Sequence, residues 1–360
     1  MKILFLANND TTIYNQRIEL VERLIKDGHE VHISSLNGDY VDKMVSMGCV
    51  YHEVFFERHG MNPLKEMGLV KQYSAILEAI KPDIIFGYTI KQNIYGSIAA
   101  GRKGISFVAN ITGLGPAVEN GGIKQKIAIV LYKYAFRNIK KVFFQNEENR
   151  AFFVKHKIAI GKHDMLPGSG VNLERYSLLP YPDDDITEFV FIGRIVKEKG
   201  IDQYLEAAEF IKNKYPKTKF HVCGKYEEEY KGKLDEYDKN GIVIYHGIID
   251  DVRTVLEHTH CTVLPTYYPE GMANVLLESA ACGRPIITTD RSGCRETIDD
   301  GVNGFVCKQK DSNDLIAQIE KFMALNWEDK KNMGLAGRTK VEKEFDRQIV
   351  IDKYLEEIAE

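Results

Sequence analysis

The sequence has few of the residues that build disulfide scaffolds. Its 360 residues include six cysteines and one tryptophan, and no two cysteines form a C-x-x-C pair. The six are Cys49, Cys223, Cys261, Cys282, Cys294 and Cys307. This low density excludes a fold held together by disulfides and predicts small apolar side chains in a reducing compartment.

Long hydrophobic runs are also absent. No stretch approaches the roughly 18–20 apolar residues that a transmembrane helix needs. The apolar segment Met1–Ala7 is followed by Asn8, Asn9 and Asp10, so it is too short for the apolar core of a signal peptide. We therefore expect a cytoplasmic protein.

Charge is unevenly divided along the chain, although the net charge is only −4. Residues 1–164 carry 22 Lys+Arg against 16 Asp+Glu, a balance of +6, and the remainder carries 26 against 36, a balance of −10. This division indicates two domains with different partners, the first partner being anionic. An ordinary solvated surface is the alternative interpretation.

Short β-branched runs alternate with helical patterns through both halves of the chain. The first strand is expected at Lys2–Ala7 and the first helix at Tyr14–Lys26, and a second series starts with a strand at Glu188–Ile192. Repeated β-α units build parallel sheets covered by helices on both faces. The sequence therefore predicts an α/β fold with two doubly wound, Rossmann-like domains that face each other across a cleft.

A connector rich in proline and glycine separates the two series at about residues 165–182. We place an N-terminal domain at residues 1–166 and a C-terminal domain at residues 167–342, which agrees with a usual domain size of about 150–200 residues. Three further expected elements are a helix at Asn93–Gly101, a helix at Ile123–Arg137 and a strand at Ile242–Tyr245.

Two cations stand at the start of the second series, where a strand ends and a helix begins. The strand is followed by Gly193 and Arg194, and then by Lys199 and Gly200 at the expected helix start. Parallel sheets gather anions at this place, because helix N-termini and cations combine there. Arg194 and Lys199 are therefore candidates for binding a diphosphate, although Arg194 alone would suit a surface ion pair.

Two carboxylates flank a later helix start. Glu270 lies in a loop after a strand, Gly271 allows close backbone approach, and Glu278 lies one turn beyond Asn274 on the same helical face. We expect Glu270 to hold sugar hydroxyls, the helix N-terminus to hold phosphate and Glu278 to hold ribose hydroxyls. The candidate residues for binding this sugar nucleotide are Glu270, Gly271, Met272, Ala273, Asn274, Val275, Leu276 and Glu278. A helix-start acid and a solvated acid are the simpler interpretation of the two glutamates.

These residues resemble a known family. Gly193-Arg194, Lys199-Gly200 and Glu270-x7-Glu278, with Ala281–Ile287 and Asp299-x-Gly301-x-Asn303, are similar to the donor site of family 4 of the retaining glycosyltransferases. The resemblance implies the GT-B fold, catalytic roles for Glu270, Arg194 and Lys199, and a nucleotide diphosphate sugar such as a UDP-sugar as donor. It also implies that residues 343–360 form a helix that returns to the N-terminal domain.

The first half departs from the common family pattern. The segment Asn8–Arg17 replaces a Gly-Gly loop, and Tyr88–Asn93 lacks the histidine of many members, so no catalytic histidine is transferred. Segments 89–96 and 111–115 are instead similar to bacterial enzymes that extend undecaprenyl-diphosphate-linked sugars in capsule, O-antigen or glycoprotein glycan assembly. The implied acceptor contacts are Arg17, Lys91, Asn93, Thr112 and Gly113. Arg17 would equally suit an ordinary helix surface.

No metal or other cofactor is expected. The acidic run Asp183–Asp185 lies in the connector without a preceding apolar strand, and His258 and His260 have no evident third ligand. The resemblance implies a retaining mechanism in which the leaving diphosphate assists the acceptor. A UDP-sugar 2-epimerase-like isomerase of the same fold and an inactive sugar-nucleotide-binding protein remain the alternatives.

A basic segment indicates where in the cell the protein is located. Residues 121–146 contain no acid but include Lys124, Lys126, Lys133, Arg137, Lys140 and Lys141, with apolar residues interleaved. A basic amphipathic helix of this kind lies on anionic membranes, which predicts peripheral association with the inner face of the cell membrane. The alternative is a helix that faces the core. Nucleic acid is not expected, because no nucleic-acid-binding module accompanies the segment.

Overall fold

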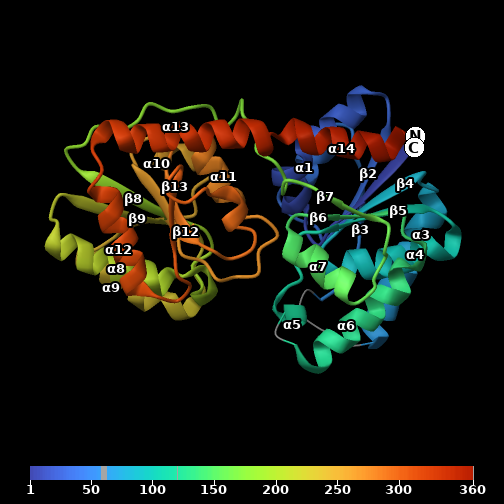
Figure 1. Cartoon of the computed structure of the whole chain (residues 1–360). Helices are drawn as coiled ribbons and strands as arrows, with labels where there is room; N and C mark the ends of the chain where they lie inside the picture. The colour runs from blue at the N-terminus through green and yellow to red at the C-terminus, as the bar shows by residue number, and fades with distance from the viewer. Residues whose placement is uncertain (58–62, 120, 360) are drawn as a thin grey trace. The chain divides into compact units, whose positions relative to one another are not determined.

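The computed structural model describes residues 1–57, 63–119 and 121–359. The chain divides into two compact units (Figure 1). The first contains residues 1–169 and 350–360, and the second contains residues 170–349. These divisions lie close to the expected boundaries at 166/167 and 342/343.

The first unit is built on a seven-stranded parallel sheet with strand order β3-β2-β1-β4-β5-β6-β7. The strands are β1 (Lys2–Leu6), β2 (Glu30–Ser35), β3 (Val50–Glu53), β4 (Ile84–Tyr88), β5 (Ser106–Ile111), β6 (Lys141–Phe144) and β7 (His163–Met165). The helices are α1 (Asp10–Lys26), α2 (Val41–Ser46), α3 (Pro63–Ile80), α4 (Ser97–Lys103), α5 (Pro116–Glu119), α6 (Gly122–Ala135), α7 (Glu147–Lys155) and α14 (Arg347–Ala359).

Side chains of β1 point alternately to two cores, because successive residues of a strand face opposite sides. Ile3 and Phe5 pack with residues of α1 and α14, whereas Leu4 and Leu6 pack with residues of α3, α4 and α6. Both faces of the sheet are therefore covered by helices, as a parallel sheet requires. The last helix contributes to the first unit, although it comes after the whole second unit in the sequence.

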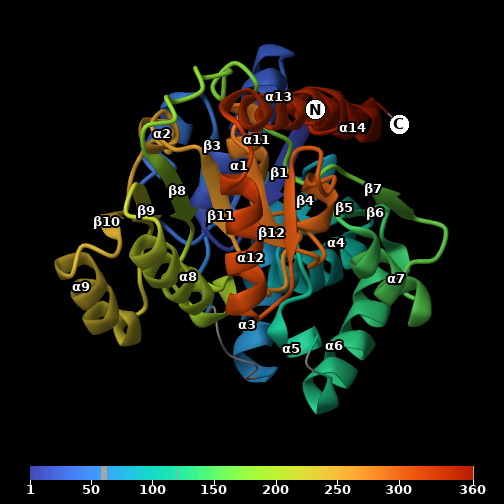
Figure 2. The same ribbon diagram turned by 60° about the vertical axis from the view of Figure 1, so that its left-hand side comes forward.

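The second unit repeats this plan with six parallel strands in the order β10-β9-β8-β11-β12-β13 (Figure 2). The strands are β8 (Thr187–Ile192), β9 (Thr218–Cys223), β10 (Ile244–Gly247), β11 (Cys261–Leu264), β12 (Ile286–Thr289) and β13 (Gly304–Cys307). The helices are α8 (Ile201–Lys214), α9 (Lys231–Lys239), α10 (Arg253–Leu256), α11 (Asn274–Ala281), α12 (Ser312–Met323) and α13 (Trp327–Glu344). Phe189 and Phe191 pack with α8 and α12, whereas Val190 and Ile192 pack with α11 on the other face.

Several elements differ from the sequence expectation. Helix α1 begins at Asp10 rather than Tyr14, because the side chain of Asn9 caps it by accepting a hydrogen bond from the Thr12 amide. The helix expected at Asn93–Gly101 is a π-helical turn, Gln92–Gly96, followed by α4. The strand expected at Ile242–Tyr245 is shifted to Ile244–Gly247. Helix α2 and strand β7 were not expected, since each is too short to show a clear hydrophobic period.

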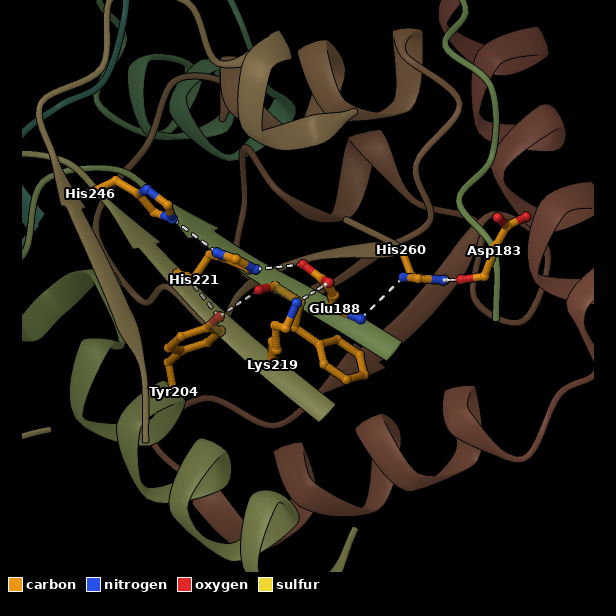
Figure 3. Close-up of polar contacts among 8 residues, drawn as sticks. Asp183, Glu188, Tyr204, Lys219, His221, His246 and His260 are labelled. Atoms are coloured by element: carbon orange, nitrogen blue, oxygen red, sulfur yellow. Dashed lines mark hydrogen bonds and ion pairs between the residues drawn. The ribbon is translucent and has the colours of Figure 1, made fainter. Parts of the chain in front are cut away.

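A polar network crosses three adjacent strands of the second unit (Figure 3). His221 Nε2 lies 2.8 Å from Glu188 Oε2, and His221 Nδ1 lies 2.9 Å from His246 Nε2. Because a carboxylate only accepts, His221 donates from Nε2 to Glu188. Lys219 Nζ also donates to Glu188, at 2.9 Å. The network ties β10, the edge strand, to β9 and β8.

His260 extends the same network toward the connector (Figure 3). Its Nδ1 accepts a hydrogen bond from the Glu188 amide at 3.1 Å, and its Nε2 donates to the carbonyl oxygen of Asp183 at 2.9 Å. Both ring nitrogens are therefore occupied by backbone groups. His260 and the connector residue Asp183 hold the start of the second sheet in place.

Acidification is expected to weaken this unit. Burial and the neighbouring His221 lower the pKa of His246, so below about pH 6.5 the unfolded chain binds the extra proton first and stability falls. Burial raises the pKa of Glu188, but hydrogen bonds from His221 and Lys219 outweigh it and lower the pKa to about 2. The stabilisation from Glu188 is present above about pH 4.5 and is lost as the pH falls toward 2.

Urea unfolding at about pH 7.5 and about pH 5.5 tests this expectation. His246→Gln should lose less stability between the two pH values than the native chain. The matched control, His258→Gln at an exposed position of the same unit, should keep the native pH dependence. Parallel pH dependences for the native chain and His246→Gln would contradict the assigned role.

Candidate functional site

The candidate donor residues lie at the point where the strand order of the second sheet reverses. Strands β9 and β10 extend from β8 to one side, and β11, β12 and β13 extend to the other. The loops after β8 and β11 therefore leave the carboxyl edge of the sheet in opposite directions, and ligands of such sheets bind between them. Arg194 and Lys199 follow β8, and Glu270 and Asn274 follow β11. The topology thus brings all four to one edge of one sheet.

A close backbone contact joins these two loops. Gly200 has φ +77°, and a Cβ atom at this position would overlap the carbonyl group of Pro265. The amide of Tyr267 donates to the carbonyl oxygen of Glu198 at 2.8 Å, and the hydroxyl of Thr266 donates to the same oxygen at 3.2 Å. Glycine is needed at position 200, because any side chain would push the two loops apart.

Lys199 and Glu270 form an ion pair across the two loops, and each side chain is only 14% exposed. The ring of Tyr268 lies close to both Arg194 and Lys199. Its centroid is 5.1 Å from the guanidinium carbon of Arg194 and 5.5 Å from Lys199 Nζ. These are cation–π distances, so Tyr268 stabilises both positive charges beside its ring. The sequence analysis did not single out Tyr268, although it lies two residues before Glu270.

Helix α11 begins directly after this loop. Its first amide groups have no partner within the helix, and an anion beside them is stabilised by the helix dipole. Asn274 Oδ1 is buried and, within the residues that the structure describes, has no hydrogen-bond partner. Met272, Ala273 and Leu276 are buried in the cores of the unit. These three residues therefore present their backbone rather than their side chains to a ligand.

Glu278 lies one turn into α11 and is partly buried. Burial raises its pKa, while a hydrogen bond from the Tyr176 hydroxyl and the positive charges of Arg347 and Arg175 act against this effect. The carboxylate is therefore oriented by Tyr176 from the connector. Tyr176 was not predicted from the sequence, because its contact with Glu278 spans about a hundred residues of chain and follows no local motif.

Gly293 packs against the loop that carries Glu270. Its carbonyl oxygen accepts a hydrogen bond from the Ala273 amide at 2.8 Å, and its own amide donates to Glu296 Oε2 at 2.7 Å. Gly293 has φ +88°, and a Cβ atom there would lie 2.8 Å from the Cβ atom of Glu270. The loop that carries Glu270 can take its place only because position 293 has no side chain.

The acceptor residues expected in the first unit lie in different environments. Lys91 follows β4 and forms an ion pair with Glu66, with 2.5 Å between Nζ and Oε1. The side-chain amide of Asn93 donates to the carbonyl oxygen of Asn110 at 2.8 Å and is buried. Thr112 and Gly113 follow β5 and are half-buried. Thus Lys91, Thr112 and Gly113 lie at the carboxyl edge of the first sheet. Asn93 instead forms a hydrogen bond with the backbone of β5.

Arg17 is only 2% exposed, so the interpretation as an ordinary helix surface is wrong. Its guanidinium carbon lies 5.3 Å from the ring centroid of Tyr88 and 5.7 Å from that of Tyr354, and Nε donates to the Tyr354 hydroxyl at 3.3 Å. Arg17 therefore connects α1 with α14 inside the first unit. Its role as an acceptor contact stays a prediction.

Family models of glycosyltransferases match both halves of the chain. Residues 181–340 match the family model of glycosyl transferases group 1, and residues 2–146 match the model of glycosyl transferase 4-like proteins. The chain is a glycosyltransferase, with the group 1 match in its second half and the 4-like match in its first half. The group 1 match covers β8 to α13 and so includes every candidate donor residue.

Two relatives with named activities are similar to this chain. The chain is 26% identical, over 99% of its length and 97% of the relative's, to N,N'-diacetylbacillosaminyl-diphospho-undecaprenol alpha-1,3-N-acetylgalactosaminyltransferase of Campylobacter jejuni. It is 32% identical to the capsular polysaccharide biosynthesis glycosyltransferase CapM of Staphylococcus aureus, over 44% of this chain and 42% of CapM.

Solved structures confirm the GT-B fold. A glycosyltransferase from Rickettsia africae superposes with a TM-score of 0.82 at 18% identity, covering 99% of this chain and 97% of the other. Alr3699/HepE from Anabaena, in complex with UDP and glucose, superposes with a TM-score of 0.80 at 17% identity, covering 100% and 99%. At these identities the likeness shows the fold alone.

Two glycine substitutions distinguish the effect of the contact between position 293 and Glu270 from the effect of backbone strain. Gly293→Ala and Gly301→Ala both place alanine at positive φ, +88° and +78°, which costs about 1–2 kcal/mol of stability in each case. Only Gly293→Ala pushes on Glu270, since nothing lies within 4 Å of a Cβ atom at Gly301. We expect glycosyl transfer to fall by about tenfold to a hundredfold in Gly293→Ala alone.

Initial rates of transfer and thermal unfolding of both variants provide the measurement. A loss of stability in both variants, larger in Gly293→Ala because of its added contact with Glu270, and a loss of transfer in Gly293→Ala alone are expected. If both variants keep native rates, Gly293 does not position the Glu270 loop for catalysis.

Proposed function

We propose that this glycosyltransferase is a retaining, metal-independent enzyme that moves a hexose or N-acetylhexosamine from a UDP-sugar to a saccharide carried on a lipid diphosphate. The observation that carries the proposal is the convergence of Arg194, Lys199 and Glu270 beside the N-terminus of α11. UDP in the neighbouring structure and the diphospho-undecaprenol acceptor of the Campylobacter relative support the choice of substrates.

The ion pair between Lys199 and Glu270 suggests how the donor enters. A diphosphate that reaches Arg194 and Lys199 competes with Glu270 for the Lys199 ammonium group. The carboxylate is then available to accept hydrogen bonds from sugar hydroxyls, while the first amides of α11 and the two cations share the phosphate charge. In this proposal Glu278, which accepts a hydrogen bond from Tyr176, also accepts hydrogen bonds from the ribose.

The proposed chemistry is a transfer on one face of the sugar. The bond between the sugar's anomeric carbon and the β-phosphate oxygen breaks, and the acceptor hydroxyl bonds to the same face of that carbon. The departing β-phosphate takes the hydroxyl proton, so UDP leaves with it and no other base is needed. Arg194 and Lys199 stabilise the charge that develops on the phosphate, which is the contribution a divalent cation makes elsewhere.

Alanine substitutions at the two cations test the donor site. Arg194→Ala and Lys199→Ala each remove a charge-assisted contact of about 1.5–3 kcal/mol, so kcat/KM should fall by roughly 10–150-fold. Lys197→Ala is the matched control, because Lys197 is an exposed cation of the same short helix, Lys197–Lys199. It should keep native turnover.

The assay measures UDP release from UDP-sugars with and without a lipid extract that contains acceptors. Native turnover in both Arg194→Ala and Lys199→Ala would refute the donor assignment. Formation of an epimeric UDP-sugar from donor alone would instead favour the 2-epimerase-like alternative.

We also propose that the first unit binds the surface of an anionic membrane through α6. Four residues spaced by three or four along this helix are exposed: Ile123 by 76%, Ile127 by 44%, Val130 by 65% and Tyr134 by 48%. The opposite side of α6, with Ala128, Tyr132 and Ala135, is buried. The helix therefore presents an apolar stripe outward, which supports the membrane interpretation over a helix that is wholly core-facing.

Positive charges accompany this stripe. Lys124, Lys126, Lys133 and Arg137 are exposed and, in the ranges described, form no ion pair. Each basic residue near an anionic membrane contributes about 1 kcal/mol of attraction. Within the described residues, no helix is long and apolar enough to cross a membrane.

Vesicle sedimentation tests this proposal. Replacing Lys124, Lys126, Lys133 and Arg137 by glutamine should abolish binding to anionic vesicles at low salt and leave UDP affinity unchanged. The matched control replaces four exposed lysines elsewhere in the first unit: Lys26, Lys81, Lys155 and Lys157. It should retain binding to anionic vesicles. Equal binding of the native protein to neutral and anionic vesicles would contradict an electrostatic contribution.

A further inference from the structure

A cavity of about 370 Å³ opens in the first unit beside the apolar stripe of α6. Helices α3, α4 and α6 and the π-helical turn 92–96 provide its walls. Its apolar wall includes Val70, Ile98 and Leu131, and Tyr95 and Tyr134 add aromatic rings. A volume of this size lies within the range of about 300–1,000 Å³ that is usual for small-molecule sites.

The cavity and the exposed stripe form one continuous surface. Ile127 and Tyr134 belong to the stripe and also line the cavity. Met67, on α3, lines the cavity and is 59% exposed. An apolar surface that is both exposed and hollowed marks a place where a ligand or partner binds.

The charges around the cavity favour a lipid over a protein partner. Lys71 and Arg102 are exposed residues of its lining, and the exposed Lys124, Lys126 and Lys133 lie on α6, which forms one wall. Protein interfaces are depleted in lysine, whereas anionic lipids attract it. The ligand is therefore expected to combine a hydrocarbon chain with a phosphate group.

One polar group connects the cavity with the edge of the sheet where the acceptor is expected. Glu66 lines the cavity and is 7% exposed, and its Oε1 forms the ion pair with Lys91, which follows β4. Burial and the nearby Glu66 carboxyl raise the pKa of Tyr95 to about 12, so its hydroxyl stays protonated at this end of the cavity. The cavity therefore extends from the proposed membrane side toward the carboxyl end of β4.

We propose that this cavity binds part of the isoprenyl chain of the lipid diphosphate that carries the acceptor saccharide. The inference rests on the proposed function and adds a binding site for the lipid part of the acceptor. The rest of the chain stays in the bilayer on which α6 lies.

A cavity-filling substitution tests the site on the full chain. Ile98→Trp places an indole in the cavity, and Ile123→Trp places the same group on the exposed stripe of α6, outside the cavity lining. Binding of farnesyl diphosphate, dodecyl phosphate and inorganic diphosphate is measured by calorimetry below the micelle concentration. The native chain and Ile123→Trp should bind farnesyl diphosphate about tenfold or more tightly than Ile98→Trp does, because chain burial drives the affinity.

The other probes complete the test. Inorganic diphosphate should bind weakly and equally to all three proteins, and dodecyl phosphate should bind more weakly than farnesyl diphosphate. Equal farnesyl diphosphate affinity in Ile98→Trp and the native chain, or tighter binding of dodecyl phosphate, would overturn the proposal. If Ile98→Trp fails to fold, Leu131→Gln replaces it, with Val130→Gln as its exposed control on the same helix.

UDP affinity separates this proposal from the proposed function. Ile98→Trp should keep native UDP affinity, because the donor residues lie in the second unit. Loss of farnesyl diphosphate binding with intact UDP binding supports the chain site. Absence of UDP binding in the native chain would instead contradict the proposed donor.

Discussion

The proposed donor site depends on a backbone contact between two loops at the carboxyl edge of the second sheet. Gly200 lies against the Pro265 carbonyl group, so the loop after β8 and the loop after β11 touch without intervening side chains. This contact brings Lys199 within reach of Glu270 and places both cations against the ring of Tyr268. Two glycines, one on each side of the Glu270 loop, thus decide where the charged groups of the site meet.

The first unit shows a different constraint, which is the attachment of its last helix. Tyr354 of α14 accepts a hydrogen bond from Arg17 and contacts the rings of Phe86 and Phe143 in the sheet. Farther along α14, the buried carboxylate of Glu357 lies 2.9 Å from Lys141 Nζ at the start of β6. The first unit is therefore complete only when the end of the chain has returned to it. Burial of Arg17 serves this attachment directly.

Helix α6 carries apolar residues on both its buried side and its exposed side. Its inner side is the narrow row Ala128, Tyr132 and Ala135, and its outer side carries the apolar stripe. Apolar residues on both sides explain why the sequence could not distinguish a membrane helix from a core helix. Only the packing of α3 and α4 shows which residues are covered and leaves a cavity beside those that are not.

The sequence alone was sufficient for the α/β class and the two doubly wound sheets, because these depend on local hydrophobic periods, and short motifs singled out the proposed donor residues of the second unit. The same local signals misplaced the start of α1 and the helix at residues 92–103, where side-chain caps and a π-helical turn decide the bounds. Tyr176, Tyr268 and Gly293 acquire their roles through contacts between segments far apart in the chain. The burial of Arg17 and the cavity beside α6 likewise arise only when helices from distant segments pack together, since burial is a property of the folded chain and not of any short stretch of it.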